Sequence, residues 1–207
     1  MSESRDHGQA ADRRRFFRID DAVRLSYRVV SEVELVEGVQ RLNQGLGGIY
    51  ALMATLAGIT QRMSVSLRRI EQHNVDVADY LRALDQKIDV LARAFVADES
   101  DLARQPAEPV NLSAGGLAIQ VAECLAPGTP LEVRLLLLPS MAGILTYGLV
   151  LSCAPTGDEE GVAAGGYQMR VDFTHIREED RDLLVRHLLR RQGEYLRTHG
   201  RSGEGKA

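Results

Sequence analysis

Two arginines near the start of the chain have the side chains and the spacing to bind a phosphate-bearing ligand. Arg14 and Arg18 form an Arg-x-x-x-Arg pattern directly ahead of the alternating stretch at 24–30. A guanidinium group can pair bidentately with phosphate or with the acceptor edge of guanine, and its flat face can stack on a purine. The pattern alone is weak, because a solvated basic leader would have the same sequence.

A second polar motif stands at the entry to another alternating stretch. Residues 111–116 read Asn-Leu-Ser-Ala-Gly-Gly and have the form Asn-x-Ser-x-x-Gly. Asn111 and Ser113 carry short polar side chains that can hydrogen-bond a guanine or a backbone turn. Gly115 and Gly116 permit positive φ and let a flat base approach the backbone closely. The same residues could instead do no more than form a turn.

Together with the strand spacing and a terminal helix, the two motifs resemble the PilZ domain, a family of bacterial receptors for the second messenger cyclic di-GMP. The resemblance covers residues 1–31 and 105–207. It implies that cyclic di-GMP is the ligand, with no further cofactor, and that the ligand-binding residues are Arg14, Arg18, Asn111, Ser113 and Gly116. Some members of the family have lost ligand binding and act as scaffolds, so a ligand-blind structural adaptor is the alternative.

Composition excludes several other classes of protein. The 25 Lys and Arg residues against 29 Asp and Glu residues give a net charge of −4, which opposes binding of nucleic acid through bulk charge. The chain has no run of eighteen apolar residues that could span a membrane, and its first fifteen residues lack the apolar core of a secretory signal. Cys124 and Cys153 lack a CxxC pattern, so we expect two solitary, buried thiols in a reducing cytosol and a cytoplasmic protein.

No catalytic or metal-binding pattern is present in the sequence. The GxxxxGK[ST], GxGxxG, HExxH and GxSxG motifs are all missing. The five histidines are scattered, without a second ligand at helical spacing. We therefore expect a binding protein that is not an enzyme and holds no metal.

The distribution of proline divides the chain into regions. All six prolines lie between Pro106 and Pro155, where short alternating segments at 116–121, 131–138, 143–153 and 166–173 indicate strands separated by turns. From Arg177 a helical period places Leu183, Leu184, His187, Leu188 and Tyr195 along one side. The predicted fold is α+β: a small antiparallel six-stranded β-barrel with a C-terminal helix and an inserted helical block. We divide it into 1–31 (basic arm and first strand), 32–104 (helical coiled-coil block) and 105–207 (the remaining barrel and final helix).

Residues 39–95 keep a heptad spacing without a slip. Seventeen positions fall on the seam of a coiled coil, and only Thr60 and Asn74 among them are not apolar. Small or apolar residues replace the charged flanks expected of a two-stranded coil, which favours a larger bundle. We predict self-assembly through these helices, as a homotetramer, with Asn74 setting the register. The alternative is an intrachain hairpin that buries its own seam.

The position of this block raises a geometric problem. One helix of 57 residues would span roughly 85 Å, although the flanking strands belong to one small domain. A hairpin would return the chain, and we predict a bend between Gly58 and Ser66, with a second weak point at glycines 45, 47 and 48. A single straight helix would instead exchange the first strand between chains and share the binding site. We expect residues 1–18 to be disordered without ligand and to become ordered on it, which would create a new surface and alter contact with a downstream protein that the sequence does not identify.

Overall fold

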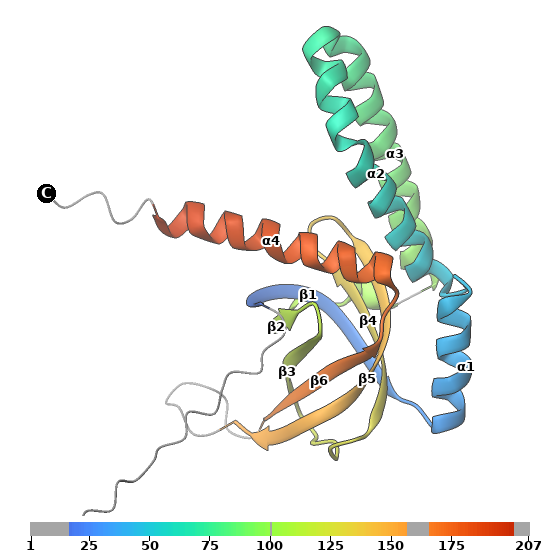
Figure 1. Ribbon diagram of the computed structural model, residues 1–207, viewed down its shortest axis with the longest axis vertical. Coiled ribbons are helices and arrows are strands. Elements are labelled where there is room, and N and C mark those ends of the chain that lie inside the picture. The colour runs from blue at the N-terminus through green and yellow to red at the C-terminus, as the bar shows by residue number, and fades with distance from the viewer. Residues whose placement is uncertain (1–16, 100, 157–165, 201–207) are drawn as a thin grey trace, which may run out of the picture.

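The computed structural model describes residues 17–99, 101–156 and 166–200. Its centre is a closed antiparallel barrel in which the strands follow the order β1-β2-β3-β6-β5-β4 (Figure 1). The strands are β1 (Arg18–Val29), β2 (Glu108–Ser113), β3 (Gly116–Val121), β4 (Pro130–Leu137), β5 (Ala142–Pro155) and β6 (Tyr167–His175). The predicted six-stranded barrel is therefore confirmed.

The barrel core follows from alternation along its strands. In β6 the side chains of Met169, Val171 and Phe173 are buried, whereas Arg170 and Asp172 between them are exposed. This pattern arises because successive side chains of a strand point to opposite faces, and a closed barrel has one apolar inside face. Each of the six strands contributes buried side chains to one cluster, which includes Leu112, Leu135 and Ile144, each 0% exposed.

The described part of the inserted block holds three α-helices and one short 3-10 helix, and it folds back on itself. It contains α1 (Glu32–Asn43), α2 (Gly48–His73), α3 (Val75–Glu99) and a short 3-10 helix, η1 (Asp101–Arg104). Figure 1 shows α2 and α3 running side by side as a hairpin, which confirms the hairpin prediction over the straight helix. The barrel closes within one chain, because β1 pairs with β2 and β4 of its own chain. None of the helices described combines the length and the apolar character needed to cross a bilayer.

The predicted site of the bend is wrong: the chain turns at Asn74, and Gly58 lies inside α2. Asn74 has an extended backbone (φ −154°, ψ 101°), and its side-chain Oδ1 accepts a hydrogen bond of 3.1 Å from the backbone N–H of Val77. It ends α2 and caps α3, a position that asparagine strongly favours. Asn74 is therefore not a register-setting seam residue within a continuous helix.

The second predicted weak point is confirmed. Gly45 and Gly48 adopt φ of +73° and +60°, and the helix breaks between α1 and α2 at this place. The break lets α1 and the start of α2 pack on different parts of the barrel. Leu42 of α1 is buried against Tyr147, and Tyr50 of α2 is buried near Leu136.

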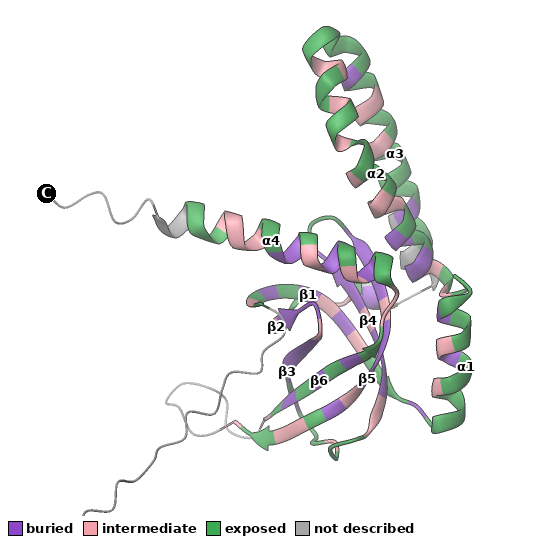
Figure 2. Cartoon of the chain, viewed as in Figure 1, coloured by how far each residue is buried: buried purple, intermediate pink, exposed green. Residues whose placement is uncertain are grey.

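Helix α4 (Glu178–Gly200) lies across the barrel and extends past it (Figure 1). Leu184 and Leu188 are 0% and 4% exposed and belong to the barrel core, as the predicted apolar side requires. Tyr195 continues that row but is 62% exposed, because the helix has by then passed the edge of the barrel. Figure 2 shows buried residues of α4 only over the barrel.

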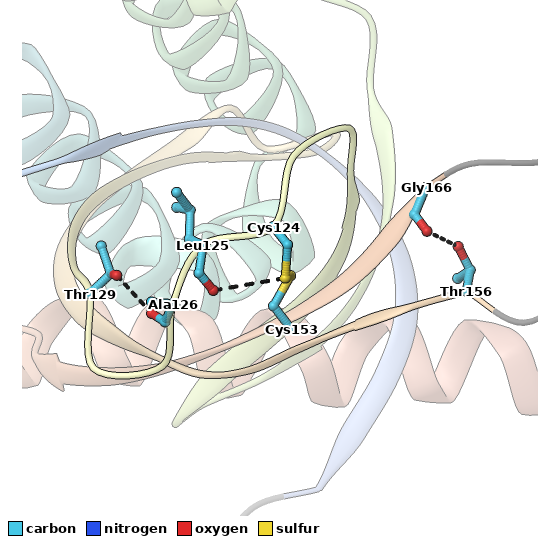
Figure 3. Close-up of a disulfide and its surroundings, with 7 residues drawn as sticks. All are labelled: Cys124, Leu125, Ala126, Thr129, Cys153, Thr156 and Gly166. Carbon is cyan, nitrogen blue, oxygen red and sulfur yellow. Dashed lines mark hydrogen bonds between the residues drawn. A yellow bond between two sulfur atoms is a disulfide. The ribbon is translucent and has the colours of Figure 1, made fainter.

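The expectation of two solitary, buried thiols is wrong, because Cys124 and Cys153 form a disulfide (Figure 3). Cys124 is exposed in the β3–β4 loop and Cys153 is half-buried in β5. The loop runs along β5, where the N–H of Gly128 bonds the carbonyl of Val150 at 2.8 Å, and this places the two cysteine Cα atoms 5.8 Å apart. The two cysteines therefore no longer support the expectation of a reducing cytosol, which was based on their being free thiols.

Candidate functional site

The pairing of β1 with β2 brings the two predicted motifs together. In the register of these strands Arg18 lies opposite Ser113 and Asp20 lies opposite Asn111. The guanidinium Nη1 of Arg18 donates to Oδ1 of Asn111 at 3.2 Å, across 93 positions of sequence. The Asn111 amide nitrogen in turn donates to Oδ1 of Asp20 at 2.8 Å. Arg18, Asn111 and Asp20 thus form a connected polar row at one end of the strand pair.

Ser113 and Gly116 shape the turn between β2 and β3. Ser113 is 3% exposed, and its hydroxyl donates to the carbonyl of Gly116 at 3.0 Å while accepting from the N–H of Gly115 at 3.4 Å. A Cβ on Gly116 would overlap the carbonyl oxygen of Val171 on β6. Gly116 is thus required by a close approach of backbone, and the residues with positive φ in the described structure do not include Gly115 or Gly116.

Of the five predicted site residues, the structure places four at this corner. Arg14 and the expected ordering of residues 1–16 lie outside the described residues. Arg18 and Asn111 are both half-buried and present polar side chains at the surface, whereas Ser113 and Gly116 support the turn beneath them. Asp20, which sequence reasoning missed, joins the site because it follows Arg18 by two residues and so points to the same side of the strand.

A cavity of about 520 Å³ opens beside Arg18. One wall is residues 17–20 at the start of β1, and the other is formed by residues between Arg191 and Leu196 of α4. Sequence reasoning did not assign the α4 wall. The available signal was Tyr195, which prolongs the apolar row of the helix beyond the length that one small barrel can cover.

The opposite side of β1 anchors α4. Asp21 is buried, and its carboxylate accepts hydrogen bonds from Nε2 of His187 at 2.6 Å and from Nε of Arg191 at 2.8 Å. Burial alone would raise the pKa of Asp21, but the hydrogen bonds from His187 and Arg191 outweigh it and hold that pKa below its usual value. Asp21 therefore stays ionised and ties the α4 wall of the cavity to the strand that carries Arg18.

A separate cavity of about 320 Å³ lies between α1, the start of α2 and the barrel. Its floor holds the buried carboxylate of Glu132, which accepts hydrogen bonds from Arg28 at 2.8 Å, Arg134 at 2.8 Å and the hydroxyl of Tyr147 at 3.1 Å. Burial alone would raise the pKa of Glu132. The hydrogen bond from Arg28 and the charge of Arg134 outweigh this effect, so the pKa lies below its usual value. These two arginines compensate a buried charge.

Within the ranges that the structure describes, no group of three or more His, Cys, Asp or Glu side chains could hold a metal ion. The Arg18 guanidinium, the Asn111 amide and the Asp20 carboxylate provide hydrogen bonding, ion pairing and stacking at this corner. A guanidinium, an amide and a carboxylate side by side can recognise a ligand that carries both phosphate and heterocyclic donors and acceptors.

Comparison with known proteins identifies the fold. Residues 79–190, more than half of the chain, match the PilZ domain. A solved protein from Xanthomonas campestris, described as a tetrameric PilZ domain self-assembled through a helical bundle, superposes with a TM-score of 0.52 at 17% identity over 88% of this chain and 91% of that chain. The Bacillus subtilis inhibitor of motility (MotI/DgrA) has 24% identity over 42% of each chain and a TM-score of 0.35. A search of curated proteins gives no match. By its sequence match and its barrel, the chain belongs to the PilZ domain family.

Proposed function

We propose that this protein binds cyclic di-GMP at the Arg18–Asn111 corner and relays that binding to another protein. PilZ domains are generally receptors for cyclic di-GMP and not enzymes. The observation that carries the proposal is the hydrogen bond between Arg18 and Asn111, which joins the two motifs on one face of the barrel. In this proposal Arg14, Arg18 and Asn111 contact the ligand, while Ser113 and Gly116 hold the turn that presents Asn111.

The chemistry of the corner suits this ligand. Cyclic di-GMP carries two phosphates and two guanines, and each guanine offers the O6 and N7 acceptors that arginine pairs with bidentately. Arg14 precedes Arg18 by four residues, so both guanidinium groups can reach one ligand from the same segment. The neighbouring cavity of about 520 Å³ gives space for the ligand beside Arg18.

We further propose that the α2–α3 hairpin assembles copies of the chain into a tetramer. Many apolar side chains along it are exposed, among them Met63 at 53%, Ile88 at 46% and Phe95 at 59%. Contiguous apolar surface of this kind in a soluble protein marks an interaction site. The Xanthomonas campestris protein, which shares this fold, is described as tetrameric through a helical bundle. The downstream partner is a protein not yet identified, and the compartment is proposed to be the cytoplasm.

The test of ligand binding is calorimetric titration of the full chain with cyclic di-GMP. We expect saturable binding by the wild type and a loss of roughly 10- to 150-fold in affinity for each of Arg14→Ala and Arg18→Ala, since a hydrogen bond to a charged group contributes about 1.5–3 kcal/mol. Arg68→Ala, an exposed arginine of α2, is the matched control and should bind as the wild type does. No binding by the wild type would favour the ligand-blind adaptor.

Self-assembly is tested separately by light scattering. We expect a mass of four chains for the wild type and a smaller assembly for the double variant Ile88→Lys/Phe95→Lys, because each lysine puts a charge on the exposed apolar surface. Gln86→Lys places the same charge at an exposed polar position of α3 and should leave the mass unchanged. A wild-type protein with the mass of one chain would refute the assembly.

A further inference from the structure

The cavity beside Arg18 has two walls that lie outside the matched family region. Residues 17–20 precede that region, and residues 191–196 follow its last residue, 190. The α4 wall carries an aromatic ring, an aliphatic side chain and a carboxylate in succession, namely Glu194, Tyr195 and Leu196. The family resemblance assigns Arg18 of the β1 wall to ligand binding, but it gives no role to the α4 residues Glu194, Tyr195 and Leu196.

Tyr195 has the position of a stacking surface. It is 62% exposed and Leu196 beside it is 61% exposed, because α4 has passed the barrel edge. Both line the same cavity as Arg18 of β1. A flat heterocycle that enters between the walls can thus place one face on the Tyr195 ring, which removes apolar surface of both from water.

Glu194 is held in place by a chain of contacts that begins in the barrel. The buried carboxylate of Asp21 accepts from Nε of Arg191 at 2.8 Å, and Nη1 of Arg191 donates to Oε2 of Glu194 at 3.0 Å. A carboxylate has about four acceptor positions, so it can accept from several donors at once. Arg191 acts here as a positioning residue, since it orients the Glu194 carboxylate at the cavity without being needed to touch a ligand.

We propose that Glu194 and Tyr195 form a guanine subsite, in which Tyr195 stacks on one base of the ligand and Glu194 reads its Watson–Crick edge. Guanine presents two adjacent donors there, N1–H and the N2 amino group, and a carboxylate can accept from both. Adenine presents an acceptor at N1, which a carboxylate repels. This inference rests on the proposed function, and it assigns to the end of α4 the selection of a guanine dinucleotide over an adenine one.

The experiment is calorimetric titration of the full chain with cyclic di-GMP and, separately, with cyclic di-AMP. For Glu194→Gln we expect at least a tenfold loss of affinity for cyclic di-GMP with no loss for cyclic di-AMP, so the preference between the two falls by at least tenfold. For Tyr195→Ala we expect a five- to 100-fold loss for cyclic di-GMP, and Tyr195→Phe should restore binding to within about threefold because it keeps the aromatic ring.

Matched controls separate these roles from effects on folding. Glu178→Gln changes an exposed carboxylate at the other end of α4, and Tyr80→Ala removes an exposed tyrosine of α3, so both should bind as the wild type does. The unliganded melting temperatures of the Glu194 and Tyr195 variants should stay within about 2 °C of the wild type, since both side chains lie beyond the barrel core.

The outcomes distinguish the two proposals. If the wild type does not bind cyclic di-GMP, the proposed function fails. If the wild type binds and Arg18→Ala weakens binding, but Glu194→Gln and Tyr195→Ala bind within twofold of the wild type, the guanine subsite alone is refuted. Equal losses for cyclic di-GMP and cyclic di-AMP in Glu194→Gln would also overturn it, because the carboxylate would then not be reading the base.

Discussion

Removing the carboxylate of Asp21 should release α4 from the barrel. The Asp21 side chain is 0% exposed, and both of its strong hydrogen bonds go to α4, one to His187 and one to Arg191. Asp20, the preceding residue of the same strand, is exposed and accepts a hydrogen bond from the side-chain amide of Asn111. The two neighbouring aspartates therefore offer the same substitution in opposite environments, one buried between β1 and α4 and one at the candidate site.

The magnitude follows from the exposure of the two partners. In Asp21→Ala, the His187 side chain at 2% exposure loses the acceptor of Nε2 and cannot regain it from water. Its Nδ1 already has no hydrogen-bond partner among the residues described. Arg191, whose side chain is 37% exposed, can be rehydrated and keeps Glu194. Breaking a buried pair costs about 3–5 kcal/mol, and this partial rehydration places the expected loss at the lower end, about 3 kcal/mol.

The assay is urea unfolding followed by circular dichroism at pH 7 and at one fixed protein concentration, because assembly makes apparent stability depend on concentration. Asp21→Ala should lower the unfolding free energy by about 3 kcal/mol, or the melting temperature by about 6–12 °C. Asp20→Ala should cost less than about 1 kcal/mol, since it loses one exposed hydrogen bond. A cost below about 1 kcal/mol for Asp21→Ala, or a larger cost for Asp20→Ala, would show that α4 is not anchored through this carboxylate.

Three further predictions concern stability. Gly116→Ala should destabilise the barrel by roughly 1–3 kcal/mol in thermal unfolding, because its methyl group would overlap the backbone of β6. The same change at Gly58, inside α2, should stabilise by about 0.5–1 kcal/mol, because the added methyl group would make only an ordinary contact with Arg62. The pKa of Glu132 is lowered in the folded state, so the stabilisation that its carboxylate contributes is present above pH 4.5, its ordinary pKa, and is lost as pH falls through the lowered pKa. In Glu132→Gln the unfolding free energy should therefore fall less between pH 5 and about pH 2 than it does in the wild type. Reductant should lower the unfolding free energy by about 2–4 kcal/mol, because the disulfide of Cys124 and Cys153 closes a loop across a sequence separation of 29. The double serine variant should not respond to reductant.

The barrel and the meeting of its motifs could be predicted because they depend on local signals. The expected strand at 116–121 coincides with β3, and the expected strand at 131–138 differs from β4 by one residue at each end. Alternation within each strand decides which side chains face the core, and this information lies in a few consecutive residues. The close approach of Arg18 and Asn111 was inferred from the family resemblance and is confirmed as a geometric fact.

The features that sequence reasoning missed depend on a choice between two local structures or on contacts with residues far along the chain. The heptad spacing continues through Asn74 without interruption, so the pattern gives no sign that its side chain caps a new helix. The pairing of Cys124 with Cys153 depends on the path of the β3–β4 loop along β5, which no pattern near either cysteine reveals. The α4 wall of the cavity depends on where the barrel ends beneath the helix.

The long insertion leaves the candidate site undisturbed because of where it joins the barrel. The helices leave the end of β1 at Val29 and return to the start of β2 at Glu108, whereas the site lies at the start of β1 and the end of β2. The six residues of β2 separate these two ends by roughly 20 Å. The pairing of Arg18 with Ser113 therefore follows from the register of two antiparallel strands and not from the length of the helices between them. A hairpin of any length that returned the chain to Glu108 would leave the two motifs facing each other.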